Sequence, residues 1–90
     1  MRILIVDDEM PARGELRYIL GTLIPEAIFS EATNGEEALE MIEREPIEVV
    51  FLDINMPGMN GLATAAAMLD GPEPPLIVFA TAYDDYALQA

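Results

Sequence analysis

Apolar residues in this chain gather in four short runs, which cover residues 2–6, 27–32, 49–52 and 76–80. Short apolar runs bounded by Gly, Pro and acidic residues are typical of strands in a parallel sheet, where helices cover both faces. The pattern therefore predicts four strands, of which the first, third and fourth are buried and the second is short. The third leads directly into Asp53 and a Pro/Gly-rich loop, and we expect it to be the central strand.

The stretch after the first strand predicts a helix with Pro11 in its first turn. Its apolar residues recur at helical spacing and are Leu16, Ile19, Leu20 and Leu23. The opposite side carries the charged residues Arg13, Glu15 and Arg17. Gly21 and Pro25 are expected to end this helix.

Two further helices are expected, one after each of the next two strands. Asn34 followed by Glu37 resembles a capping box at a helix start. The inward residues expected in that helix are Ala38, Leu39 and Ile42, with its glutamates in water. The inward stripe expected in the alanine-rich third helix is Leu62, Ala65, Ala66 and Leu69. Alternating strands and helices imply one α/β domain with a doubly wound parallel sheet and right-handed crossovers.

The composition restricts the chemistry of the chain. Its 90 residues suffice for one domain with a modest core and include no cysteine, histidine or lysine. Disulfides, thiolate metal sites and Ser-His-Asp catalysis are thereby excluded, so any metal is held by oxygen, as Mg²⁺, Ca²⁺ and Mn²⁺ are. The net charge of −13 disfavours direct binding to nucleic acid. No apolar run is long enough to cross a membrane, and no signal peptide is expected.

Acidic residues follow two of the predicted strands. Asp7 and Asp8 come directly after the first strand and Asp53 ends the third, while Thr81 ends the fourth. The first and third strands of a doubly wound sheet are neighbours, so we expect the three carboxylates to converge at its carboxyl edge. Two carboxylates about 4 Å apart repel by roughly 4 kcal/mol at an effective dielectric near 20. Three such carboxylates imply a bound cation, a raised pKa or a function. Mg²⁺ answers this well, since it accepts one or two carboxylates, a carbonyl and several waters.

These motifs resemble the receiver domain of bacterial two-component response regulators. The resemblance rests on the Asp7-Asp8 pair, Asp53 at a strand end, the loop at 56–61 and the pair at 81–82, in the order and spacing of that family. The segment 79–87 is similar to the subgroup that carries LytTR-type DNA-binding domains. The resemblance implies a flavodoxin-like fold with strand order 2-1-3-4 and a cytoplasmic location.

The resemblance also implies a role for each residue. Asp53 is expected to accept a phosphoryl group from a sensor histidine kinase, so the domain catalyses at most its own phosphorylation and dephosphorylation and is otherwise no enzyme. Mg²⁺ is expected to bind Asp8, Asp53 and the backbone carbonyl of Asn55 directly, and Asp7 through a water. The Thr81 hydroxyl is expected to bond the phosphoryl oxygen and to carry the switch.

The chain departs from the family at its C-terminal side. The fifth strand and helix, and the lysine that pairs with the phosphoryl group, have no counterpart in residues 1–90. We therefore expect a truncated receiver whose phosphoryl transfer is impaired and which lacks the DNA-binding domain. The fourth strand is expected to become an exposed apolar edge that promotes self-association, by edge pairing or by exchange of elements between chains.

Other functions remain as alternatives. The chain could be a protein-interaction or dimerisation module that keeps the receiver shell and signals without phosphorylation. A phosphohydrolase with an aspartate nucleophile is disfavoured, because those enzymes have a second aspartate where this chain has Asn55, and a lysine. A dinucleotide-binding domain is disfavoured because acidic residues stand at 7–9 in place of a glycine-rich loop.

Overall fold

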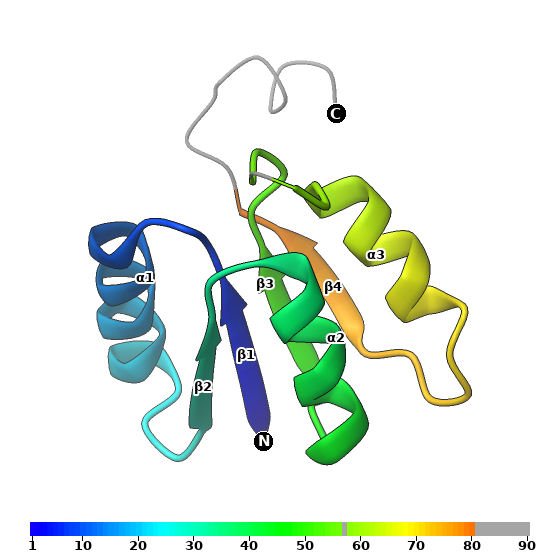
Figure 1. The fold of residues 1–90 in the computed structure, drawn as a ribbon. Helices are drawn as coiled ribbons and strands as arrows, with labels where there is room; N and C mark the ends of the chain where they lie inside the picture. The colour runs from blue at the N-terminus through cyan, green and yellow to red at the C-terminus, as the bar shows by residue number, and fades with distance from the viewer. Residues whose placement is uncertain (57, 81–90) are drawn as a thin grey trace.

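The structure is a computed structural model that describes residues 1–56 and 58–80 (Figure 1). Strands and helices alternate along this part of the chain. The strands are β1 (Arg2–Val6), β2 (Ile28–Ala32), β3 (Val49–Leu52) and β4 (Leu76–Phe79). The helices are α1 (Met10–Leu23), α2 (Gly35–Arg44) and α3 (Gly61–Leu69). No helix of the described part is long and apolar enough to cross a membrane.

All the strand pairs are parallel, and the sheet order is β2-β1-β3-β4. This confirms the doubly wound α/β fold and the strand order 2-1-3-4. Val6 pairs with Ala32 on one side and with Leu52 on the other, and Leu52 pairs with Phe79. The carboxyl ends of the strands therefore lie level with one another. Residues that follow these ends are brought to the same edge of the sheet.

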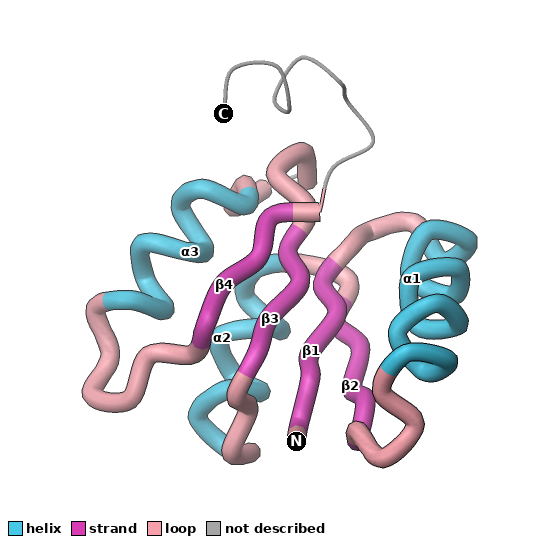
Figure 2. The backbone as a smooth tube through the Cα atoms, turned by 180° about the vertical axis from the view of Figure 1, so that it is seen from behind, coloured by secondary structure: helices cyan, strands magenta, loops and turns pink. Residues whose placement is uncertain are grey.

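Helix α1 covers one face of the sheet and α2 and α3 cover the other (Figure 2), and each face carries its own apolar cluster. Leu4 and Val6 of β1 face α2 and α3, whereas Ile3 and Ile5 face α1. This alternation follows from the two-residue period of a strand. In β3, Val50 and Leu52 are fully buried on the α2–α3 face, but Val49 and Phe51 are only half-buried on the other. The third run is thus buried on one face and partly covered on the other.

Helix α1 has the predicted start but a narrower buried stripe. Of the four apolar residues expected to face the core, Leu20 is buried and Leu16 packs against the sheet. Ile19 and Leu23 are exposed, and Leu23 is the last residue of the helix. The expected break at Gly21 is wrong. A glycine weakens a helix without ending it, and α1 ends at Leu23, just before Pro25.

Helix α2 begins as the capping pattern predicts. The Glu37 amide donates to Asn34 Oδ1 over 2.8 Å, and Glu37 Oε1 accepts from the Thr33 amide over 2.9 Å. In a capping box this second bond comes from the amide of the cap residue, which is Asn34 here. The observed bond comes instead from Thr33, one residue earlier. Ala38 is fully buried, and Leu39 and Ile42 pack against the core as expected.

The stripe predicted for α3 is wrong at three of its four positions. Leu62, Ala66 and Leu69 are exposed, and only Ala65 is buried. The buried residues are Gly61, Thr64, Ala65 and Met68. The reason is close packing. A Cβ on Gly61 would collide with the carbonyl oxygen of Asp53, and a Cβ on Gly35 would collide with the Thr64 hydroxyl. Small residues must face these contacts, so the leucines are turned outward.

Strand β4 lies at one edge of the sheet in the part that the structure describes. The prediction of a buried fourth strand is wrong there, because Leu76, Val78 and Phe79 are exposed and Ile77 is half-buried. The expected exposed apolar edge is present. Such an edge presents unpaired backbone groups to other chains.

We expect the 90-residue chain to self-associate through β4 at micromolar concentration, and Leu76→Glu to shift it toward the monomer because the added charge blocks edge pairing. Leu62→Glu is the matched control, since Leu62 and Leu76 are 55% and 65% exposed and the charge change is the same. Light scattering after size-exclusion chromatography measures the mass. A monomeric wild type, or equal shifts in both variants, would contradict β4 association.

Candidate functional site

Three carboxylates meet at the carboxyl edge of the sheet. Asp7 and Asp8 follow β1 and Asp53 follows β3, and one carboxylate oxygen of each lies within 4.8 Å of the other two. The backbone ladder continues one residue past the strands, since the Asp53 amide donates to the Val6 carbonyl over 3.0 Å. The predicted convergence of these carboxylates is therefore confirmed. It follows from the register of neighbouring parallel strands.

Asp7 is anchored through three of its polar groups. Its amide donates to the Ala32 carbonyl over 3.1 Å, and its Oδ1 accepts from the Glu9 amide over 2.9 Å. Its carbonyl accepts from Nη1 of Arg13 over 2.8 Å. The backbone of the β1–α1 loop is thus tied to β2, to α1 and to itself. Asp7 is half-buried, whereas Asp8 is exposed.

Asp53 is half-buried, and the backbone around it is closely packed. The Asn55 amide donates to Asp53 Oδ1 over 3.3 Å. The first residue of α3, Gly61, lies directly against the Asp53 backbone, and its amide donates to the Ile54 carbonyl over 2.9 Å. A side chain at position 61 would push the Asp53 carbonyl away. The lack of a side chain at Gly61 therefore lets the Asp53 backbone, which carries the carboxylate, keep this position.

The surroundings raise the pKa of Asp53 above its ordinary value. Burial is the largest cause, and the charges of Asp7, Asp8 and Glu9 act in the same direction, while the hydrogen bond from the Asn55 amide opposes them. The ionised form is thus penalised both by lost solvation and by like charges. A bound cation would offset the repulsion between Asp53 and these like charges.

The donor set fits a hard divalent cation. The carboxylates of Asp7, Asp8 and Asp53 supply only oxygen, and the described residues include no imidazole or thiolate. Mg²⁺ prefers one or two carboxylates and keeps several waters. A cluster whose ligand atoms spread over as much as 4.8 Å suits an ion that binds two carboxylates directly and a third through water. The residues present therefore fit Mg²⁺.

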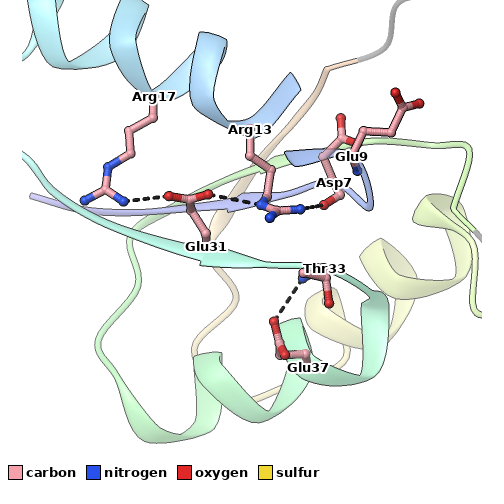
Figure 3. A network of polar contacts seen from close by, with 7 residues as sticks. All are labelled: Asp7, Glu9, Arg13, Arg17, Glu31, Thr33 and Glu37. Carbon is pink, nitrogen blue, oxygen red and sulfur yellow. Dashed lines mark hydrogen bonds and ion pairs between the residues drawn. The ribbon is translucent and has the colours of Figure 1, made fainter. Parts of the chain in front are cut away.

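A network of ion pairs next to the site was not predicted (Figure 3). Glu31 of β2 accepts from Arg13 Nε over 3.0 Å and from Arg17 Nη1 over 2.6 Å. The pKa of Glu31 is lowered, first by its hydrogen bond with Arg17 and further by Arg13. The sequence pattern assigned both arginines to the outer side of α1. Their four-residue spacing, about one helical turn, and an acid in the next strand were the available signal.

Of the two other predicted site residues, the structure describes Asn55. The amide of Asn55 contacts Asp53 and the residue is exposed, so it lies beside the carboxylates. Its role as a carbonyl ligand stays a prediction. Thr81 lies outside the described residues.

A sequence profile for the family described as "Response regulator receiver domain" matches residues 3–90. The chain belongs to this family. The resemblance inferred from the sequence is thereby confirmed, and the three carboxylates follow the receiver domain's β1 and β3.

Curated relatives agree with this assignment. The receiver domain is 47% identical over 90 residues to "Sensory transduction protein LytT" of Bacillus anthracis, covering 100% of this chain and 37% of the relative. It is 44% identical over 91 residues to "Positive alginate biosynthesis regulatory protein" of Pseudomonas aeruginosa, with 100% and 37% covered. The chain thus spans little more than a third of the length of these relatives.

Solved structures share the fold. The response regulator TrrA of Thermotoga maritima, crystallised with Mg²⁺-BeF, is 38% identical with a TM-score of 0.84, over 94% of this chain and 72% of that chain. The response regulatory domain of mrkE from Klebsiella pneumoniae is 30% identical with a TM-score of 0.84, over 100% and 74%. A second structure shows TrrA in complex with the histidine kinase ThkA, at 38% identity and a TM-score of 0.81, over 91% and 69%.

Gly61→Ala is expected to lower stability by about 1–3 kcal/mol, because its Cβ overlaps the Asp53 backbone. Gly14→Ala is the matched control. A Cβ at Gly14 meets nothing within 4 Å, so the same change there is expected to raise stability by up to about 1 kcal/mol through helix propensity. Urea unfolding followed by circular dichroism measures both. Similar effects of the two changes would contradict the close contact.

Asp53→Asn is expected to stabilise the receiver domain at pH 7 without divalent cations. Because folding raises the pKa of Asp53, ionised Asp53 disfavours the folded state at pH 7, and this penalty fades as the pH falls toward about 4. The gain is expected as a higher Tm that shrinks as the pH is lowered. Thermal scans at several pH values in a chelator measure it. The exposed Glu26→Gln is the control, and a gain that persisted unchanged at low pH would rule out ionisation of Asp53 as its cause.

Proposed function

We propose that this receiver domain is a phosphoacceptor, in which Asp53 takes a phosphoryl group from the phosphohistidine of a sensor histidine kinase with Mg²⁺ as cofactor. The observation that supports this is the half-buried Asp53 carboxylate, whose oxygen lies within 4.8 Å of those of Asp7 and Asp8 at the open edge of the sheet. A carboxylate held on rigid backbone beside a cation site is what a phosphoryl acceptor requires.

Asp53 is the nucleophile in this proposal. One of its oxygens attacks phosphorus, the bond between phosphorus and the donor imidazole breaks, and an acyl phosphate forms on Asp53. Bound Mg²⁺ supplies charge neutralisation for the transferring phosphoryl group. The packing of Gly61 against the Asp53 backbone holds the nucleophile in place while the donor approaches.

Each remaining site residue has a proposed role. Asp8 and Asp53 hold Mg²⁺ directly together with the Asn55 carbonyl, and Asp7 acts through a water. Asp7 is anchored at its amide, its carbonyl and one side-chain oxygen, which suits a residue that orients a ligand water. The Thr81 hydroxyl bonds the phosphoryl oxygen and carries the switch.

The proposed partner is a cytoplasmic sensor histidine kinase. The similarity to TrrA, whose complex with the kinase ThkA has been solved, supports this class of partner. The net charge of −13 disfavours nucleic acid as a direct partner of these residues.

The 90 residues contain no lysine, and a cationic donor aimed at a developing charge is worth a few kcal/mol. We therefore expect phosphoryl transfer to this chain to be slow.

Incubation with acetyl phosphate and Mg²⁺ is expected to add one phosphoryl group, detected by intact-mass spectrometry, and none with a chelator. Asp53→Asn is expected to abolish the addition because the nucleophile is gone. Asp70→Asn, at the exposed end of α3, is the matched control and is expected to be modified like wild type. An unmodified wild type would favour the alternative of an interaction module that signals without phosphorylation.

A further inference from the structure

Arg13 connects the acidic site to a neighbouring strand. Its side chain is only 11% exposed, and its guanidinium lies between Asp7 and Glu31 (Figure 3). Nη1 donates to the Asp7 backbone carbonyl over 2.8 Å, and Nε donates to Glu31 Oε1 over 3.0 Å. One side chain of α1 therefore holds the end of β1 and the end of β2 together.

The Asp7 carbonyl belongs to the peptide unit that joins Asp7 to Asp8. Because a peptide unit is planar, fixing the direction of this carbonyl also fixes the Asp8 amide and the direction in which Asp8 leaves the strand. β1 ends at Val6 and α1 begins at Met10, so this carbonyl lies in neither element. Arg13 supplies the bond that holds it.

Arg13 is itself held from β2. Glu31 binds Arg13 through Oε1 and Arg17 through Oε2, the latter over 2.6 Å. The planar guanidinium can donate in two directions at once, toward Glu31 and toward the Asp7 carbonyl. A lysine ammonium at the same position is a single point of charge on a flexible chain and does not reproduce this fork.

We propose that Arg13 is a positioning residue for the Mg²⁺ site, because it holds the Asp7–Asp8 peptide unit and thereby the Asp8 carboxylate. The inference rests on the proposed function, since it takes the three carboxylates as the Mg²⁺ ligands. Partners that orient metal ligands commonly change metal affinity by about 10–100-fold when they are removed.

The direction in which Mg²⁺ affinity changes when Arg13 is replaced distinguishes a positioning role from a purely electrostatic one. Arg13 is a cation close to the site, and removing a cation strengthens the binding of Mg²⁺ if its charge is all that matters. Loss of the hydrogen bond to the Asp7 carbonyl frees the peptide unit and weakens binding. The two explanations therefore predict opposite changes in the dissociation constant.

The test is the Mg²⁺ dissociation constant of the 90-residue chain, measured by isothermal titration calorimetry with MgCl₂ alone. Arg13→Gln is expected to weaken binding by about tenfold. Arg13→Lys keeps the charge and loses the fork, so it is also expected to weaken binding. Arg44→Gln is the charge-matched control in the exposed last turn of α2 and is expected to bind as wild type does.

Equal or tighter binding by Arg13→Gln, in a chain that binds Mg²⁺ and loses it on Asp53→Asn, would overturn the positioning role alone. A wild type that binds no Mg²⁺, or binding that survives Asp53→Asn unchanged, would overturn the metal site and this role with it. If Arg13→Gln does not fold, Arg13→Lys decides, because unchanged binding in that variant contradicts the proposal and weaker binding supports it.

Discussion

The mutual repulsion of three carboxylates at one edge of a parallel sheet is the constraint on which the rest of this molecule depends. Asp7, Asp8 and Asp53 are brought together by the level ends of β1 and β3. Like charges at this spacing oppose folding unless a cation or a proton is bound. The surrounding structure therefore has to hold the carboxylates in place against a force that would separate them.

Small residues and backbone bonds provide that hold. Gly61 lies against the Asp53 backbone, and Gly35 lies against Thr64, so small residues stand at the closest contacts of α3 with the β3 end and with α2. On the other side of the site, the Asp7 amide and carbonyl are bound by Ala32 and Arg13. The site thus rests on main-chain contacts, which are less easily displaced than contacts between exposed side chains.

Two of the four arginines, Arg13 and Arg17, lie beside the site rather than in it, whereas Arg2 is at the opposite end of β1. Among the described contacts, Arg13 and Arg17 pair with Glu31, and Arg2 pairs with Glu45. These pairs occupy the guanidinium groups with other carboxylates. None of these pairs involves the carboxylates of Asp7, Asp8 or Asp53, and the charges of the first two add to burial in raising the pKa of Asp53.

The sequence by itself determined the order of elements, the parallel sheet and the meeting of Asp7, Asp8 and Asp53. Each depends on local periodicity or on the register of neighbouring strands, and both are visible along the chain. Only the tertiary structure decided which face of α3 is buried and where the guanidinium of Arg13 lies. These depend on Gly61 meeting Asp53 and on Arg13 meeting Glu31, and individual atomic contacts between different elements leave no periodic pattern along the chain.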